Sequence, residues 1–554
     1  MQNIDYTNKY IMTKIKFLFS LAIGILLSFQ VSAQAQKEWQ HLSYSQDGIY
    51  GVESNRAYDE LVKGEPGVKV LVAVIDSGTD IQHEDLNSVL WTNKGEIAGD
   101  GIDNDNNGYI DDIHGWSFLG GEGYDVLEET LELTRLYARY SKQFEGKDVK
   151  KLSRKEKKEY KKFQKIKADF EKERSEAQEQ YDGFNAQIHY FMRNYSLVSS
   201  YIDNKSFKFN DLKKINTQDS IINNGVNMFA MILQADTTVS VDVVMQGMHK
   251  KVERTNNYFT EKLEYNLNPE WAPRADKGYD EGDFENFNYG DNTYLVDPEN
   301  NIHGTHCAGI IGADRTNEIG MNGIASNVEI MTVRAVPNGD EHDRDIAAAI
   351  RYAVDNGARV ISMSFGKSYS YNKEGVDAAI KYGVKKGVLF VHAAGNDGKN
   401  LDDKKNTNFP NVKNSSRNAK AWIEVGASSW KTGEDLPAVF SNYGKKSVDL
   451  FAPGVDIYST FPLNRYEAIS GTSMACPAVA GVAALVMSQY PKLSAKQVKT
   501  ILMKSVTDLK DLDVKQPNGR RDEEEKIVKF GSLSKTGGIV NAYEALKLAK
   551  KMSK

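Results

Sequence analysis

Three short segments, far apart in the chain, each place one reactive side chain among small residues. They read VAVIDSGTD at 72–80, HGTHCAG at 303–309 and GTSMACP at 471–477. The reactive side chains are the carboxylate of Asp76, the imidazole of His303 and the hydroxyl of Ser473. A serine hydroxyl becomes a nucleophile when an imidazole takes its proton, and a carboxylate holds that imidazole in the useful tautomer. Small neighbours let a peptide backbone come close, so the pattern predicts acyl transfer from a peptide.

The local sequence predicts where each of these side chains lies in the fold. Asp76 follows an apolar run at 70–75, typical of a buried parallel strand whose carboxyl end carries the site. His303 and Ser473 each precede a segment of helical character, so we expect both at helix starts. Unpaired backbone N–H groups there would face the oxyanion formed by attack of Ser473. We expect Pro477 in the first turn of that helix, where a missing N–H costs little.

In this order, Asp then His then Ser, the segments resemble those of the subtilisin-like serine proteases, the subtilases. Four further segments resemble subtilase signatures: VISMSFG at 360–366, AAGND at 393–397, VFSNYG at 439–444 and DLFAPG at 449–454. The resemblance covers roughly residues 38–118 and 296–547. It implies an α/β fold, a three-layer sandwich around a mostly parallel sheet, with an added helical subdomain.

The resemblance also implies roles for individual residues. Asn396 and the backbone N–H of Ser473 would form the oxyanion hole. The substrate would add as a strand to a channel lined by Ser364, Phe365, Gly366 and Gly395. The implied activity is that of an exported serine endopeptidase working through an acyl-enzyme on protein or peptide substrates. The alternative is a catalytically idle, protease-like scaffold that binds a partner through its helical insertion.

The spacing of the motifs predicts the domain organisation. Asp76 and His303 are 227 positions apart, far more than in subtilases of minimal size. We therefore expect a signal peptide at 1–35, a catalytic domain in two parts at 36–121 and 273–554, and a helical insertion at 122–272.

Hydrophobic spacing predicts helices in the insertion. Apolar stripes at spacings of three and four run through Leu133, Leu136, Tyr140 and Phe144, and through Tyr160, Phe163, Ile166 and Phe170. Ser153 and Glu156 form a capping box before the second stripe, so we expect two or more helices packed as a hairpin. The interleaved glutamates of the lysine-rich stretch at 150–162 favour a solvated helix face over a polyanion site. The insertion is expected to restrict access or to position protein substrates.

Composition and the first residues bear on partners and location. A net charge of −6, from 70 basic and 76 acidic residues, argues against a nucleic-acid partner. Lys14 and Lys16 precede an apolar run at 17–29, with small residues for cleavage after Ala33 or Ala35. This signal peptide predicts export to the periplasm or the medium, as a monomer with no stable membrane span after cleavage; an uncleaved anchor is the alternative. The family's usual inhibitory prodomain is expected to be missing.

A second candidate site is the acidic loop GDGIDNDNNGYIDD at 99–112. Its donors match the first, third, fifth, seventh (backbone carbonyl) and ninth positions of a calcium loop: Asp103, Asp105, Asn107, Tyr109 and Asp111. The bidentate glutamate expected at the twelfth position is replaced by His114, for which Asp112 is a possible substitute. We predict a structural calcium ion here, because so many carboxylates repel one another without a cation.

The chain contains two cysteines, Cys307 and Cys476, each one helical turn after a reactive residue. We expect two buried free thiols; a disulfide, permitted in an exported protein, is the alternative.

Overall fold

The computed structural model describes residues 35–65, 67–121, 123–298, 301–413, 415–519 and 525–554. They form two compact units, one of residues 35–139 and 269–554 and one of residues 140–268. The smaller unit lies within the expected insertion, and residues 123–139 and 269–272 of that stretch belong to the larger unit. The predicted signal peptide, apart from Ala35, lies outside the described residues.

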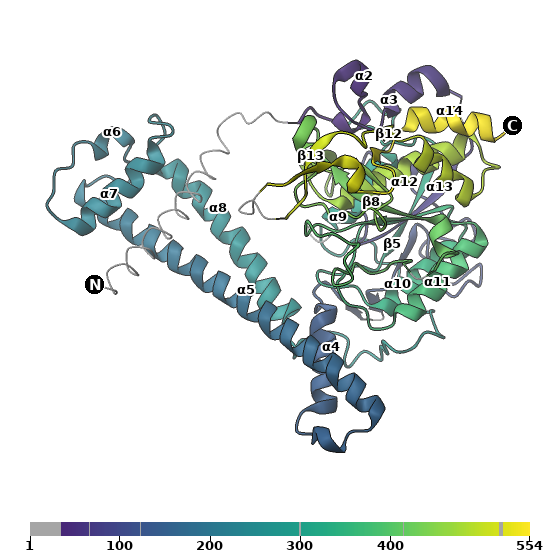
Figure 1. The fold of residues 1–554 in the computed structure, drawn as a ribbon, viewed down its shortest axis with the longest axis horizontal. Coiled ribbons are helices and arrows are strands. Elements are labelled where there is room, and N and C mark those ends of the chain that lie inside the picture. Colours follow the sequence, from purple (N-terminus) through teal and green to yellow (C-terminus); the bar gives the residue numbers. More distant parts are fainter. Residues whose placement is uncertain (1–34, 66, 122, 299–300, 414, 520–524) are drawn as a thin grey trace. The chain divides into compact units, whose positions relative to one another are not determined.

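A nine-stranded sheet forms the centre of the larger unit in the described part of the chain (Figure 1). Its spatial order is β12-β15-β9-β8-β7-β6-β1-β5-β2, and every neighbouring pair is parallel except β12 and β15. The strands are β1 (Val70–Asp76), β2 (Gly115–Ser117), β5 (Val328–Arg334), β6 (Val360–Met363), β7 (Leu389–Ala393), β8 (Trp422–Ser428), β9 (Leu450–Pro453), β12 (Thr507–Asp508) and β15 (Gly538–Ile539).

Alternate residues of each strand pack into different cores, which makes the unit a three-layer sandwich. In β1, Val70, Val72 and Val74 belong to one core, and Ala73 and Ile75 to the other. The first core contains α9 (Ile302–Gly312), α12 (Thr472–Gln489), α13 (Ala495–Lys504) and α14 (Ala542–Met552), and the second contains α10 (Asp343–Asp355) and α11 (Lys373–Lys386). A parallel sheet covered on both faces reads as continuous apolar strands, as expected for 70–75.

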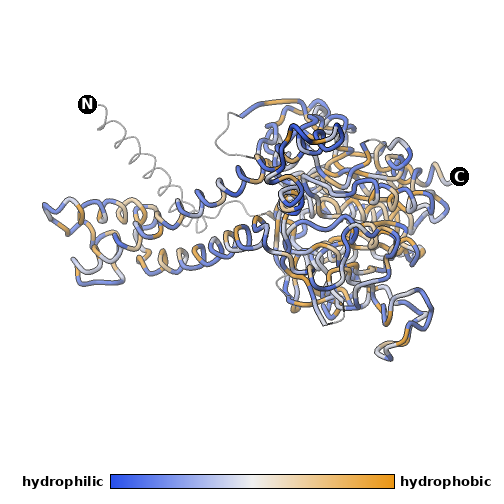
Figure 2. The backbone as a smooth tube through the Cα atoms, turned by 90° about the horizontal axis from the view of Figure 1, so that it is seen from below, coloured by the Kyte–Doolittle hydropathy of each residue, from blue (hydrophilic) through white to orange (hydrophobic). Residues whose placement is uncertain are grey.

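Helix α12 is apolar on all sides. Among the described residues it alone is long and apolar enough to cross a membrane, and 89% of it is buried inside the unit. Such burial is typical of the central helix of a water-soluble core. In Figure 2 the hydrophobic residues are correspondingly frequent where the sheet and its helices pack.

Short elements complete the larger unit. Trp39 near its amino end is fully buried and donates its indole N–H to the Val455 carbonyl. The short elements are α2 (Tyr44–Asp47), α3 (Ser54–Ala57), and the strand pairs β3 (Gly120–Gly121) with β4 (Tyr124–Asp125), β10 (Ile457–Phe461) with β11 (Arg465–Ile469), and β13 (Asp513–Lys515) with β14 (Ile527–Lys529).

The smaller unit is helical and has a core of its own. Its elements are the end of α4 (Glu132–Phe144), α5 (Arg154–Tyr201), α6 (Phe209–Leu212), α7 (Ser220–Leu233) and α8 (Val241–Thr260). The predicted capping box of Ser153 and Glu156 begins α5, and Phe144 of α4 stacks on Phe163 of α5. The predicted helical hairpin is therefore confirmed. Far along α5, Phe191 packs with Phe207 and Phe229.

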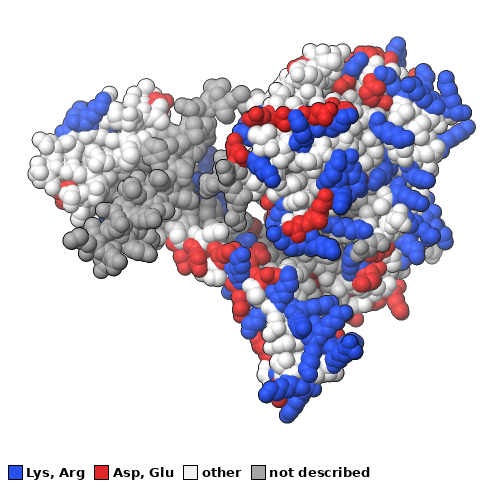
Figure 3. Space-filling view, in the orientation of Figure 1, with Lys and Arg blue, Asp and Glu red and all other residues white. Residues whose placement is uncertain are grey.

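The lysine-rich beginning of α5 lies on the surface. Lys155, Lys157 and Lys158 are exposed, and blue side chains are dense where α4 meets α5 (Figure 3). Farther along, Lys165 pairs with Asp169 and Lys167 with Glu171, one helical turn apart. This exposed, partly paired arrangement fits a solvated face.

The aromatic core predicts that Phe229→Ala destabilises the helical unit by about 3–5 kcal/mol, because a fully buried ring leaves a cavity. All six tryptophans lie outside residues 140–268, so their fluorescence reports on the larger unit, whereas circular dichroism reports on all helices. In urea, the variant should lose helical signal earlier while the fluorescence midpoint stays unchanged. Equal shifts in both signals would contradict a separately folding insertion.

Candidate active site

The order of the central strands brings three polar segments to one edge of the sheet. Strands β7, β6 and β1 are neighbours and run parallel, so their carboxyl ends lie side by side. Asp76 ends β1, Ser364 directly follows β6, and Gly395 lies two residues beyond β7. These positions carry the predicted carboxylate, substrate strand and oxyanion segment.

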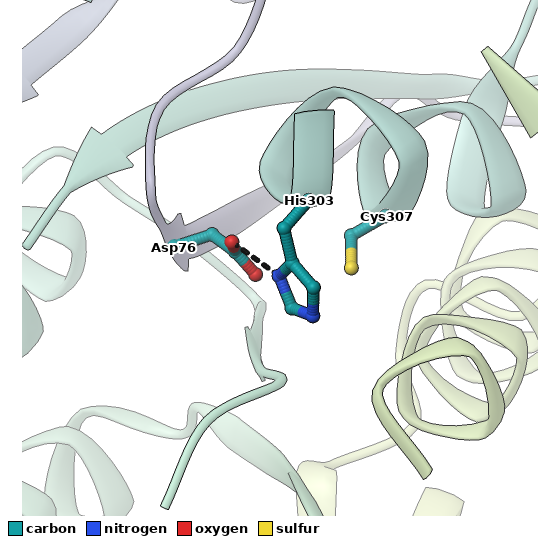
Figure 4. Close-up of side chains that lie close together, drawn as sticks. All are labelled: Asp76, His303 and Cys307. Atoms are coloured by element: carbon teal, nitrogen blue, oxygen red, sulfur yellow. Dashed lines mark hydrogen bonds and ion pairs between the residues drawn. The ribbon is translucent and has the colours of Figure 1, made fainter. Parts of the chain in front are cut away.

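Asp76 and His303 contact each other directly. The Nδ1 atom of His303 lies 2.6 Å from Oδ1 of Asp76, and Figure 4 shows the ring edge facing the carboxylate. Asp76 is buried, and the His303 side chain is 38% exposed. Helix α9 approaches this closely because residue 304 is glycine: a Cβ atom there would lie 2.0 Å from the carbonyl oxygen of Gly78.

The carboxylate changes the protonation of the imidazole. Burial by itself lowers the pKa of His303, but the charge of Asp76 and its hydrogen bond outweigh burial and raise that pKa above 6.5. The neighbouring His306 contacts the backbone carbonyl of Ile457 instead; burial, together with the charge of His303, lowers its pKa to about 3. Of these two histidines, His303 is therefore the one suited to accept a proton near neutral pH.

Ser473 is the second residue of α12, and it exchanges two hydrogen bonds with Ser364. The Ser473 hydroxyl donates to the Ser364 carbonyl at 3.0 Å, and the Ser364 hydroxyl donates to the Ser473 carbonyl at 2.9 Å. In this conformation the Ser473 proton points to the strand end rather than to His303. Its pairing with the imidazole needs a rotation of the hydroxyl, which is common before substrate binds.

Cys307 connects the two halves of the site. Its Sγ atom lies within 4.8 Å of a His303 ring nitrogen and an Asp76 carboxylate oxygen (Figure 4), and it donates to the Ser473 carbonyl at 3.4 Å. The structure thus brings Asp76, His303 and Ser473 into one neighbourhood.

The expected place of Pro477 was wrong. Helix α12 begins at Thr472, so Pro477 is its sixth residue and lies beyond the first turn. Proline has no N–H, so the bond that this position would donate to the carbonyl of Ser473, four residues earlier, cannot form. Ser364 and Cys307 supply hydrogen bonds to that carbonyl instead.

Asn396 is anchored by its side-chain oxygen. Its Oδ1 atom accepts hydrogen bonds from the backbone N–H and the hydroxyl of Thr472, both at 2.9 Å. A Cβ atom built on Gly471 would lie 3.5 Å from the Ser473 nitrogen and 3.6 Å from Nδ2 of Asn396. Both nitrogens therefore lie within 4 Å of one point beside Gly471.

Two of the four predicted channel residues, Gly366 and Gly395, lie near Asn408. A Cβ atom on Gly366 would lie 2.3 Å from Oδ1 of Asn408, and one on Gly395 would lie 3.8 Å from its Nδ2. Gly395 has a φ of 98°, which favours glycine, and its N–H donates to the hydroxyl of Thr472. Ser364 and Phe365 are buried, whereas Gly366 is exposed.

Side chains of the acidic loop at 99–112 accept hydrogen bonds from backbone N–H groups of the same loop. The Asp103 carboxylate accepts two backbone N–H groups of the loop, and the Asp111 carboxylate accepts two from glycines. The N–H of Tyr109 donates to the side chain of Asn107. Four of the five predicted ligands thus accept backbone N–H groups of the loop: Asp103, Asp105, Asn107 and Asp111.

A tighter acidic cluster lies beside them. Glu96, Asp105 and Asp112 each bring one carboxylate oxygen within 4.8 Å of the others, and Asn93 donates to both aspartates. Burial, with the charge of Asp105, raises the pKa of Asp112 to about 6. Carboxylate oxygens of like charge, held this close together, suit a divalent cation such as Ca²⁺. The calcium-loop pattern does not include Glu96. The only sequence indication of its role is that an acidic residue lies seven positions before Asp103.

Comparison with known proteins decides the family. The profile of the subtilase family matches residues 67–520. This chain belongs to the subtilase family. The thermophilic serine proteinase of Bacillus sp. (strain AK1) is 43% identical over 223 residues, 40% of this chain and 49% of that protein. Thermitase of Thermoactinomyces vulgaris is 40% identical over 195 residues, 35% of this chain and 63% of that protein. This subtilase thus spans about half to two thirds of these relatives.

Two solved structures are also similar to this subtilase. A protease from Pseudoalteromonas arctica shares 28% identity, covering 45% of this chain and 70% of that chain, with a TM-score of 0.35. A cold-adapted subtilisin-like serine proteinase shares 32% identity, covering 40% and 72%, with a TM-score of 0.33.

Both cysteines of this subtilase are buried free thiols, as predicted. Cys476 donates to the carbonyl oxygen of Val391 in β7 at 3.2 Å, and burial raises its pKa to about 12. Burial also raises the pKa of Cys307, so both thiols stay protonated at neutral pH.

The contact of His303 with Asp76 predicts an imidazole pKa above 6.5, which histidine-selective NMR titration measures. Asp76→Asn should lower this pKa, because the change removes the charge that favours the protonated ring. His306 provides an internal control, since it should stay neutral throughout the titration from pH 5 to 9. A His303 midpoint unchanged in Asp76→Asn would show that the carboxylate does not govern the ring.

Proposed function

We propose that this subtilase is an exported serine endopeptidase that hydrolyses peptide bonds through Ser473, His303 and Asp76. The observation that carries the proposal is the 2.6 Å contact between His303 and Asp76 beside the start of α12. A buried carboxylate on Nδ1 leaves Nε2 as the nitrogen that can take and return a proton. Family membership supports the same reaction class.

The reaction follows from these positions. The Ser473 hydroxyl turns from the Ser364 carbonyl to His303 Nε2, loses its proton to that nitrogen, and attacks the scissile carbonyl carbon. The oxyanion forms between Nδ2 of Asn396 and the Ser473 N–H. His303 then gives the proton to the leaving amine, and water releases the acyl group by the reverse transfer. Asp76 stays ionised and stabilises the imidazolium.

Substrate is proposed to add as a strand along Ser364, Phe365 and Gly366. Main-chain hydrogen bonds would hold it, with Gly395 and Asn396 on the opposite side of the scissile bond's carbonyl. The exposure of Gly366 supports this, since a side chain there would collide with Asn408 and obstruct the channel.

A fluorophosphonate probe tests this function. Ser473 of the purified protein should be labelled and casein cleaved, whereas Ser473→Ala should show neither. Asp76→Asn should slow labelling by about four orders of magnitude, since the imidazole loses its orientation. Ser488→Ala, at the other end of α12, is the matched control and should be labelled normally. A folded wild-type protein that stays unlabelled would favour the second candidate, an idle scaffold acting through its insertion.

We also propose a structural calcium ion at the acidic loop, held by Glu96, Asp105 and Asp112 with oxygen donors from the sequence-predicted set. The cation would offset the burial and the charge of Asp105, which together raise the pKa of Asp112. It would thereby tie the loop to α10, where the Tyr352 hydroxyl donates to Asp112 at 2.6 Å.

Chelation tests the calcium proposal. Calcium at one hundred times its Kd should stabilise the fold by about 2.7 kcal/mol, so EGTA should lower the Tm. Asp112→Asn should abolish this difference between calcium and EGTA, whereas Asp100→Asn, outside the cluster in the same loop, should keep it. A wild-type Tm equal in calcium and in EGTA would refute the site.

The proposed location is the periplasm or the medium, and the proposed state is a monomer. The amino-terminal sequence supports export, as does a similar protein, the cell wall-associated protease of Bacillus subtilis, 36% identical over 208 residues.

A further inference from the structure

A buried lysine directly follows the candidate substrate strand. The side chain of Lys367 is 1% exposed, and its Nζ atom lies 3.0 Å from Oε2 of Glu132 and 2.9 Å from Oδ1 of Asp343. It also donates to the carbonyl oxygen of Glu341. A buried charge is tolerated only when it is paired, so the side chain has one well-defined position.

The backbone of Lys367 is held as firmly as its side chain. Its N–H donates to the Phe409 carbonyl at 3.0 Å, and the Phe409 N–H donates back at 2.9 Å. The end of the segment 364–366 is therefore fixed by the backbone bridge between Lys367 and Phe409 and by the two carboxylates that hold the Lys367 ammonium. A strand that pairs with substrate must hold its N–H and C=O groups in register, so a shift of Lys367 is passed to Gly366.

One of the two carboxylates comes from the stretch predicted as inserted. Glu132 is the first residue of α4 and is fully buried, and its N–H donates to Oδ2 of Asp340 at 2.8 Å. Arg135 contacts the same Glu132 carboxylate at 2.8 Å. Just before α4, the Glu129 N–H donates to the Asn338 carbonyl at 2.9 Å. The first residues of the predicted insertion are thus built into the unit that carries the strand.

The other carboxylate reaches the segment after the strand. Asp343 begins α10, and its Oδ2 atom accepts hydrogen bonds from the Ser370 hydroxyl and the Asn372 N–H. The Lys367 ammonium therefore links α4, α10 and the segment 367–372. If either carboxylate moves, the lysine loses a partner, and the end of the strand is released.

We propose that Lys367, paired with Glu132 and Asp343, is a positioning residue for extended substrates. In this way the beginning of the insertion takes part in holding substrate along residues 364–366. The inference rests on the proposed endopeptidase function. It adds a physical reason why the enzyme would bind long peptides better than short substrates. Lys367 acts through the strand and does not contact the reacting atoms.

Two substrates of different length provide the test. An eight-residue fluorogenic peptide should extend along residues 364–366. A single-residue nitrophenyl ester should contact mainly Ser473 and the proposed oxyanion donors. Lys367→Met should raise KM for the peptide about tenfold with kcat changed less than threefold, and should affect the ester far less. Lys367→Arg, which keeps the charge, should restore part of the peptide KM.

A double-variant cycle separates positioning from simple destabilisation. Glu132→Gln should raise the peptide KM in the same direction, and its combination with Lys367→Met should cost less than the sum, because the two side chains act as a pair. Lys499→Met is the matched control: it removes another interior lysine paired to a carboxylate, Asp449, at 3.1 Å. It should lower stability and leave the ratio of peptide to ester KM unchanged.

The outcomes distinguish the two proposals. If fluorophosphonate does not label the wild-type protein, the proposed endopeptidase function is refuted, and the positioning role of Lys367 is refuted with it. Wild-type labelling with a KM ratio unchanged in both Glu132→Gln and Lys367→Arg overturns the positioning role alone. If Lys367→Met fails to fold, these two milder variants decide the question, and additive effects in the cycle also count against it.

Discussion

The parallel register of β1, β6 and β7 is the constraint on which the rest of this molecule depends. Because the three strands are neighbours and run the same way, the residues that follow them meet at one edge without any long-range side-chain contact. Helices α9 and α12 pack on one face of that sheet and begin at this edge. The carboxylate of Asp76, the imidazole of His303, the hydroxyl of Ser473 and the proposed oxyanion donor Asn396 are thereby assembled from four segments that lie far apart in the chain.

Much of this could be predicted from the sequence, because it depends on local patterns. The apolar run before Asp76 predicts the buried strand, and the residues after His303 and Ser473 predict helices. Ser153 with Glu156 predicts the start of α5. The resemblance to subtilases then supplied the sheet and the candidate site, while hydrophobic spacing alone indicated the helical hairpin.

The parts that could not be predicted depend on contacts between distant residues. The Ser364 hydroxyl reaches the Ser473 carbonyl across 109 positions, and the Lys367 ammonium reaches Glu132 across 235. The sequence around these residues does not indicate that they pair with each other. The acidic loop was found by its spacing, but spacing does not tell which carboxylates accept backbone N–H groups. Asp111 matches a ligand position and accepts N–H groups of two glycines. Glu96, outside the pattern, accepts three backbone N–H groups and also joins the acidic cluster.

The proline in α12 has a mechanical consequence. A normal helix fixes its second residue through its own ladder of hydrogen bonds, so the residue moves with the helix. Here the ladder is interrupted at Pro477, and the carbonyl of Ser473 is held by the end of β6 and by α9. Thermal motion that displaces α12 along its axis is resisted at this point by the strand and by the helix carrying His303. The start of α12 is therefore joined through this carbonyl to the end of β6 and to α9, in place of the bond that Pro477 removes.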